Sequence, residues 1–230
     1  MNKKTSLVLR VCRPDGTSHG GFQWPLTVGA EVVAPDWEAN DECGNGLHGW
    51  LYGQGHYGCA SYWEKSDAKW LVLEVESERI QMLEGKCKFE RCIVRFVGDR
   101  AEAAAHLIEH EPKSADVAVI GASLQVGAKQ SGLVGALGTL TGGYRSTLTG
   151  GDYSTLTGGD YSTLTGGDYS TLTGGDESTL TGGDCSELRI RYWDDKADRY
   201  RTAIAYVGEN GIKPYVAYRL DDNHQFVEAA

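Results

Sequence analysis

Four residues in the N-terminal half of the chain have the types and spacing of metal ligands. Cys43, His48, His56 and Cys59 form the pattern C-x4-H-x7-H-x2-C. Two thiolates and two imidazoles suit tetrahedral zinc. Their spacing differs from that of a standard zinc finger, whose first pair is closer. The alternative is a glycine-rich loop in which His48 hydrogen-bonds to the backbone and Cys43 packs inside. We favour this alternative, so we expect no metal.

A short glycine-rich segment, Gly53–Gly58, invites comparison with phosphate-binding loops. Such loops end in Lys-Ser or Lys-Thr and open a helix, because the lysine and the helix N-terminus hold the phosphates. Neither feature is evident here. The segment therefore does not favour nucleotide binding, and we expect no cofactor.

A third arrangement concerns a nicotinamide cofactor. Ser18-His19-Gly20, followed by Tyr57 or Tyr62, is similar in order to the residues that cradle this cofactor in ADP-ribosyltransferases. That resemblance implies a catalytic glutamate, and none stands out, since Glu74 and Glu90 are candidates by position alone. No Ser-His-Asp set has a supporting motif either. An enzyme is therefore less favoured than a non-enzymatic protein.

Composition limits the class of protein. The 230 residues are 40% hydrophobic and 23% charged, as in ordinary soluble proteins. The net charge of -10 argues against a nucleic-acid binder and against docking on anionic membranes. No apolar run has the length of a membrane span, and none before Arg10 has the length of a signal peptide. We therefore expect a cytoplasmic protein whose six cysteines are free thiols.

An eight-residue repeat dominates the second half of the chain. Six consecutive octads of the type TLTGGDYS run from Thr139 to Ser186, and a weaker form extends upstream through residues 123–138. Each octad has one large aliphatic residue, so a single octad cannot bury anything alone and neighbours must stack. Downstream, residues 187–194 replace the polar repeat residues by bulky ones.

The octad predicts a strand followed by a corner. In Ser-Thr-Leu-Thr, alternation places Ser and Leu on one face and the two Thr on the other. The Gly-Gly that follows permits positive φ and a tight corner. Two octads close one coil, so we predict a flattened, two-sided β-solenoid of sixteen residues per coil, with successive coils about 4.8 Å apart. The alternative is a triangular coil of twenty-four residues.

Two other interpretations of the repeat are less favoured. A flexible Gly/Ser/Thr linker would not need the strict register of leucines. Calcium-binding GGxGxD repeats have a period of nine, whereas the period here is eight throughout.

The octad resembles half of the sixteen-residue repeat of bacterial ice-nucleation proteins. The residues that carry the resemblance are Ser154-Thr155-Leu156-Thr157 and its copies, with Tyr153, Tyr161 and Tyr169. The resemblance implies a two-sided coil with Thr-x-Thr rows and tyrosine ladders. It does not by itself imply ice activity.

The N-terminal segment predicts a small α+β domain. Strands are expected at residues 7–11, 69–75 and 92–97, and a turn at Asp15-Gly16. A helix is expected from Arg100 to His110, capped by Asp99 with Glu102. Its apolar face would consist of three residues, which are Ala104, Leu107 and Ile108.

This segment also resembles an uncharacterised family found in bacteriophages and bacteria. The matching stretches are TSHGGFQWP (residues 17–25), APDW (34–37), CGNGLHG (43–49), KWLV (69–72) and VGDRAE (97–102). The tail of the chain also resembles this family. Many members carry short glycine-rich repeats after this domain. The resemblance implies a phage or prophage relation and no particular activity.

The C-terminal segment predicts a β-rich cap. Strands are expected at residues 187–192, 200–207, 214–220 and 225–228. An open solenoid end exposes apolar side chains and unpaired backbone, so terminal coils need capping. The residues suited to close the last coil are Leu188, Ile190, Tyr192 and Trp193; the helix and residues 115–122 would close the first.

These features predict a mainly β protein in three parts: an α+β domain at 1–112, a two-sided β-solenoid at 113–194 and a β cap at 195–230. The favoured function is a structural or interaction protein that self-associates, most simply as a closed dimer. The alternatives are a binding module, for ice or as a DNA mimic whose repeat carries six acidic residues against Arg145, and an enzyme or zinc protein. The candidate interface residues are Tyr153, Tyr161 and Tyr169. The candidate binding residues on the repeat faces are Thr147, Thr149, Thr155, Thr157, Thr163, Thr165, Thr171 and Thr173.

Overall fold

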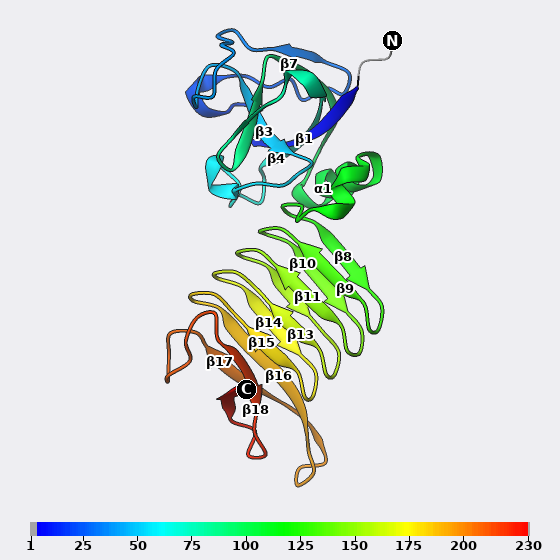
Figure 1. Ribbon diagram of the computed structural model, residues 1–230, viewed down its shortest axis with the longest axis vertical. Helices are drawn as coiled ribbons and strands as arrows, with labels where there is room; N and C mark the ends of the chain where they lie inside the picture. Colours follow the sequence, from blue (N-terminus) through cyan, green and yellow to red (C-terminus); the bar gives the residue numbers. More distant parts are fainter. Residues whose placement is uncertain (1–3, 230) are drawn as a thin grey trace. The chain divides into compact units, whose positions relative to one another are not determined.

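The computed structural model describes residues 4–229 and is mainly β (Figure 1). The outermost residues of the predicted N-terminal domain and of the predicted cap, 1–3 and 230, lie outside this part. The chain divides into two compact units, residues 1–120 and 121–230. The second unit contains both the repeat and the C-terminal strands.

The first unit is built on a seven-stranded antiparallel sheet in the order β2-β7-β4-β1-β3-β6-β5. The three predicted strands are confirmed as the central parts of β1, β4 and β7. The bounds are β1 Thr5–Cys12, β2 Glu31–Val33, β3 Leu47–Leu51, β4 Lys69–Glu76, β5 Gln81–Leu83, β6 Lys86–Phe89 and β7 Arg91–Gly98. Short 3-10 turns lie at η1 His19–Gly21, η2 Tyr57–Cys59, η3 Ser77–Arg79 and η4 Pro112–Asp116.

The single α-helix of the described residues, α1, spans Arg100–His110 as predicted. Asp99 and Glu102 form the expected capping box, each accepting a backbone N–H of the other. The helix contacts β1, β4 and β7. Its buried residues are Ala103, Ala104 and Leu107, which confirms two of the three predicted apolar residues. Ile108, the third, is half-buried. No helix in residues 4–229 is long and apolar enough to cross a membrane.

The second unit contains a β-solenoid of two parallel sheets, whose coils stack in Figure 1. Leu140 pairs with Leu156 in one sheet and Leu148 with Leu164 in the other, so each coil contains sixteen residues. The predicted two-sided coil is confirmed, and the triangular alternative is wrong. The bounds are β8 Ser123–Val126, β9 Ser131–Val134, β10 Thr139–Gly142, β11 Thr147–Gly150, β12 Thr155–Thr157, β13 Thr163–Thr165, β14 Thr171–Gly174 and β15 Thr179–Thr181.

The solenoid core is formed by leucine and serine, as the alternation predicts. The repeat leucines from Leu140 to Leu188 have no exposed surface. The serines stack beside them, and the Oγ atoms of Ser154 and Ser170 lie 3.1 Å apart. The Ser170 Oγ also accepts the N–H of Ser154 at 3.2 Å. Hydrogen bonding between coils therefore removes the cost of burying these hydroxyls.

The corners differ from the prediction. Positive φ falls on the seventh residue of each octad, including Tyr153 at 57° and Glu177 at 55°, and not on Gly-Gly. The left-handed backbone at the seventh residue lets its N–H donate to a carbonyl of the next coil. The Tyr153 N–H, for example, donates to the Asp168 carbonyl at 2.7 Å. The glycines are required by space instead. A Cβ on Gly151 would lie 2.6 Å from the Ala136 backbone nitrogen of the preceding coil.

The C-terminal strands extend both solenoid sheets: β16 continues one sheet in parallel, and the other added pairs are antiparallel. β16 (Glu187–Asp194) pairs with β14 and with β17 (Arg199–Tyr206), and β15 pairs with β18 (Ala217–Leu220), which pairs with β19 (Phe226–Glu228). Of the residues predicted to close the last coil, Leu188 and Ile190 are buried and Tyr192 stacks on His224. The prediction is wrong for Trp193, which is 41% exposed because alternation points it outward.

Candidate functional site

Both faces of the solenoid carry outward threonines in rows. Each strand places two of them about 6.6 Å apart, and neighbouring coils repeat the pair about 4.8 Å away. The threonines of the first two TLT coils are exposed, and those of the third coil are half-buried. We call these surfaces the threonine faces. The face on β10, β12 and β14 has Thr139, Thr141, Thr155, Thr157, Thr171 and Thr173; the face on β11, β13 and β15 has Thr147, Thr149, Thr163, Thr165, Thr179 and Thr181.

One edge of the solenoid, here the tyrosine edge, consists of Tyr153, Tyr169 and Cys185. The two rings stack with centroids 4.9 Å apart and planes 11° apart, as the sixteen-residue coil predicts. Tyr153 is 38% and Tyr169 is 54% exposed. Tyr215 extends this edge because its hydroxyl donates to the Asp168 carboxylate at 2.5 Å. That hydrogen bond raises the pKa of Tyr215 to about 12.

The opposite edge carries Arg145, Tyr161 and Glu177. The guanidinium of Arg145 lies over two rings, 5.1 Å from the centroid of Tyr144 and 5.3 Å from that of Tyr161. The same two rings meet edge to face at 5.7 Å. This edge therefore mixes aromatic and charged groups, whereas the tyrosine edge has no charged residue at the seventh octad position.

The repeat aspartates have a structural contact that the sequence analysis did not foresee. The Asp152 carboxylate accepts the N–H of Asp168 at 3.0 Å, and the Asp168 carboxylate accepts the N–H of Asp184 at 2.8 Å. Asp160 binds the N–H of Asp176 in the same way at 3.0 Å. Each carboxylate thus satisfies a backbone donor at the corner of the next coil.

The first unit contains a cavity of about 730 Å³ beside β1, β3 and β6. It brings together segments that the sequence analysis considered separately. Ser18–Gly20 and Tyr62 line it, as do Cys43, His48 and Cys59. Tyr57 and His56 are not among its lining residues. The full lining consists of residues 10–12, 18–22, 24, 35–36, 43–48, 59–62 and 86.

Two cationic residues, Arg10 and Lys86, line this cavity. The Arg10 guanidinium donates from Nη1 to the His48 carbonyl at 2.9 Å and lies 5.2 Å from the Trp24 ring centroid. Burial lowers the pKa of Arg10 to about 10. Burial, together with Lys86, Arg10 and Lys88, lowers the pKa of His48 to about 4, so His48 is neutral near pH 7. The Lys86 ammonium donates to the Cys43 Sγ at 3.0 Å.

The four residues considered as zinc ligands each contact other groups of the protein. Cys43 lies beside Lys86, Cys59 donates to the Glu84 carbonyl at 3.8 Å, and the His56 ring stacks on Tyr57. In residues 4–229, no group of three or more His, Cys, Asp or Glu side chains could hold a metal ion. The six cysteines are unpaired, and burial raises the pKa of Cys87 and Cys92 to about 12.

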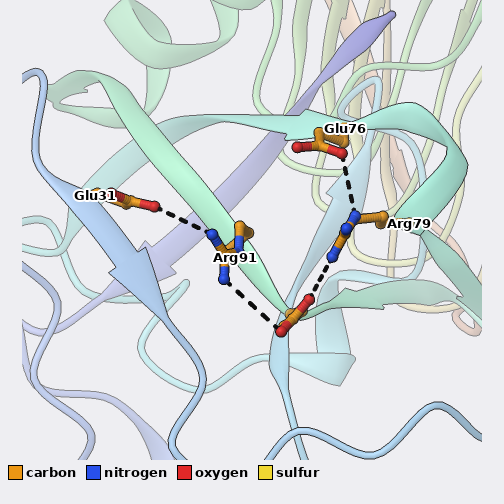
Figure 2. Close-up of polar contacts among 5 residues, drawn as sticks. Glu31, Glu76, Arg79 and Arg91 are labelled. Atoms are coloured by element: carbon orange, nitrogen blue, oxygen red, sulfur yellow. Dashed lines mark hydrogen bonds and ion pairs between the residues drawn. The ribbon is translucent and has the colours of Figure 1, made fainter. Parts of the chain in front are cut away.

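The two glutamates considered as catalytic candidates lie in ion pairs outside the cavity lining. Glu90 forms ion pairs with Arg79 at 2.7 Å and with Arg91 at 3.9 Å. Figure 2 shows this cluster, in which Glu76 and Glu31 pair with the same two arginines. Glu74 pairs with Arg95 at 2.9 Å. The Glu74–Arg95 pair links the neighbouring strands β4 and β7, and Glu90, which lies between β6 and β7, pairs with Arg79 of η3. Neither glutamate is among the residues that line the cavity with Ser18–Gly20.

The phosphate-loop candidate also has a packing explanation. A Cβ on Gly53 would lie 2.6 Å from the Leu107 side chain, and one on Gly55 would lie 2.5 Å from the Trp50 ring. The segment ends within the short turn η2, Tyr57–Cys59, and does not open an α-helix. Its glycines therefore allow close packing.

The fold and the repeat define a structural β-solenoid protein, and comparison with known proteins agrees. Residues 6–106 match a family model described as a domain of unknown function (DUF7666). Ice nucleation proteins are similar over about half of the chain, which confirms the resemblance of the octads. The protein of Xanthomonas campestris pv. translucens is 34% identical over 124 residues, which are 53% of this chain and 7% of that protein.

Two further ice nucleation proteins are similar at the same level. That of Pseudomonas fluorescens is 36% identical over 115 residues (49% of this chain, 9% of that protein), and that of Pseudomonas syringae pv. syringae is 38% identical over 110 residues (47% and 9%). The chain thus spans less than a tenth of the length of each of these relatives. No solved structure matches.

Proposed function

We propose that this chain is a non-enzymatic structural protein whose solenoid self-associates as a dimer through the tyrosine edge. The observation that carries the proposal is the exposed, stacked pair of Tyr153 and Tyr169. Stacking holds the rings in one geometry, so little conformational entropy remains to be lost when a partner covers them. Tyrosine is also among the residues enriched at protein interfaces.

The tyrosine edge suits association better than the opposite edge. There, Arg145 and Glu177 occupy the same octad position as the tyrosines and would have to lose water on contact. Arg145 is moreover held over two rings of its own chain. The tyrosine edge presents rings and the Cys185 thiol, which are cheaper to desolvate.

A dimer requires more surface than two rings provide, since stable interfaces bury about 1,200–2,000 Å² in total. The adjoining threonine face supplies uncharged, flat surface for the rest. A two-fold pairing uses the tyrosine edge once in each copy and so closes the assembly at a dimer.

The test compares two double variants by light scattering at micromolar concentration. Tyr153→Asn with Tyr169→Asn removes both rings, and asparagine tolerates the left-handed backbone at these positions. Arg145→Asn with Glu177→Asn is the matched control, because it changes the same octad position on the other edge and leaves the net charge unaltered. We expect the first variant to be a monomer and the control to remain a dimer. A monomeric wild type, or equal masses for both variants, contradicts the proposal.

A second candidate function is ordering of water or ice on the threonine faces. Regular rows of exposed threonine and the names of the similar ice nucleation proteins favour it. The faces are small, however, with three TLT strands each, and ice-active surfaces gain from area. We therefore expect weak activity at most. A droplet-freezing assay of wild type against Thr155→Lys with Thr157→Lys tests it, because lysine would disrupt one face.

Three further expectations complete the proposal. The aspartate contacts with backbone N–H groups support a structural role over DNA mimicry. The resemblance of residues 17–49 to a family from phages and bacteria supports a phage or prophage relation. The thiols are compatible with a cytoplasmic location, where they would stay reduced.

A further inference from the structure

The cavity of the first unit is lined by a half-buried cation, Arg10, that has no carboxylate partner. Arg10 lies on β1 beside the Trp24 ring, and its Nε atom is buried with no hydrogen-bond partner in the described residues. Among residues 4–229, no carboxylate forms an ion pair with Arg10 or with Lys86, which faces the same space. Buried charges in proteins are normally paired, because desolvation of a lone ion costs several kcal/mol.

The only carboxylate in the cavity lining does not fill this role. Asp36 is the single acidic residue among the lining side chains, and its Oδ1 accepts the Gly46 N–H at 3.1 Å. Lys86 donates to the Cys43 Sγ instead. The lining therefore has two cations, Arg10 and Lys86, against one engaged carboxylate, in a protein whose net charge is -10.

A second polar side chain of the cavity lining, His48, also has an unpaired buried atom. The His48 Nε2 is buried and has no hydrogen-bond partner in the described residues. His48 and Arg10 also line a smaller hollow next to the main cavity, together with Lys86. Each unpaired buried polar atom costs free energy that a ligand could recover.

The remaining walls suit a small organic molecule. A volume of about 730 Å³ is in the range of small-molecule sites. Phe22 and Tyr62 supply apolar surface, and Gly44 has φ of 115° with open space where a side chain would lie. Only glycine adopts this backbone readily, and it leaves the loop free to approach a ligand.

We propose that this cavity binds a small organic anion whose carboxylate or phosphate group lies against Arg10 and Lys86. Arg10 supplies a planar donor to the oxyanion and Lys86 a point charge. His48 supplies a neutral hydrogen-bonding atom beside them, and the aromatic walls hold the body of the ligand. The inference concerns the first unit alone and does not depend on self-association of the solenoid.

The test is calorimetric titration of the full chain with three probes of matched size: benzoate, phenyl phosphate and uncharged benzyl alcohol, in equal salt. We expect one of the two anions to bind at one site per chain, and its identity shows whether carboxylate or phosphate is preferred. Benzyl alcohol should bind much more weakly. Binding of neither anion at millimolar concentration overturns the proposal.

Variants locate the site. Lys86→Gln should weaken binding about tenfold, as loss of a charge-assisted hydrogen bond does. Arg10→Lys keeps the positive charge but loses the planar guanidinium, and it should weaken binding further. Lys196→Gln is the matched control, since it removes one exposed lysine of the hairpin between β16 and β17. Equal affinities of Lys86→Gln and Lys196→Gln would place the anion elsewhere and refute the assignment.

Discussion

Replacing Gly151 by alanine tests why the repeat needs glycine at the fifth octad position. The added Cβ would lie 2.6 Å from the Ala136 nitrogen and 3.0 Å from the Ala136 Cα. The two coils must then separate at this corner. Two backbone hydrogen bonds cross it, from Gly151 N–H to the Val134 carbonyl at 3.2 Å and from Leu137 N–H to the Asp152 carbonyl at 2.8 Å.

The magnitude follows from these contacts. Weakening one or both hydrogen bonds at a buried corner costs about 1–3 kcal/mol each. Alanine would ordinarily stabilise a compatible glycine site by about 0.4–1 kcal/mol through the unfolded state. We therefore expect Gly151→Ala to lower the free energy of unfolding by about 2–4 kcal/mol.

The assay is urea unfolding followed by far-ultraviolet circular dichroism, with Gly127→Ala as the control. Gly127 has the same octad position in the first coil, but a Cβ there meets only the Gln130 side chain, at 3.2 Å and beyond. Its substitution should change the free energy of unfolding by less than about 1 kcal/mol. If Gly151→Ala and Gly127→Ala have equal stability, close approach of the coils is not why the octad contains glycine.

Three other predictions follow from the same structure. Leu156→Ala should destabilise the protein by about 2–5 kcal/mol in urea unfolding, whereas exposed Thr157→Ala should change it by less than about 0.5 kcal/mol. Glu177→Gly should raise the free energy of unfolding by about 1 kcal/mol, because glycine adopts the left-handed backbone at this position without strain. Thr179→Gly, within a strand, should lower the free energy of unfolding. A change in the same direction for both variants would contradict this prediction. The pKa of His48 is lowered from 6.5 to about 4, so on acidification the unfolded chain binds a proton at this residue before the folded chain does. The free energy of unfolding should therefore fall as the pH drops from 6.5 to about 4, and His48→Gln should make that decrease smaller. If the pH dependence of stability is the same in His48→Gln and wild type, this prediction is wrong.

The sequence predicted the solenoid well because its information is local and repeated. Leu148 and Leu164 are identical in an identical frame, so alternation and a coil of two octads were enough to place both inside. The helix Arg100–His110 was predicted for a similar reason, since its capping box lies within four residues. The corner was misjudged because tyrosine and glutamate have no preference for left-handed φ. Hydrogen bonds between coils, which only the stacked structure shows, impose it on Tyr153.

The cavity was beyond sequence reasoning. Its lining comes from residues 10–12, 18–22, 43–48 and 59–62, which meet only when the sheet order β4-β1-β3-β6 is known. Periodicity indicates that β1 and β4 are strands, but it does not say which strands pair. Three of the four residues in the cysteine and histidine pattern, Cys43, His48 and Cys59, line this cavity. Residue type alone does not separate ligands of a metal from walls of a cavity.

Spin labelling measures directly whether two octads make one coil of the solenoid. Nitroxides would be attached to Thr155→Cys with Thr171→Cys, or to Thr155→Cys with Thr163→Cys, in a background without the native cysteines. Thr155 pairs with Thr171 in neighbouring strands about 4.8 Å apart, whereas Thr163 lies in the other sheet, about 10 Å away and facing outward. A coil of sixteen residues predicts strong spin–spin broadening for the first pair and none for the second. Broadening in the second pair, or its absence in the first, would contradict the sixteen-residue coil.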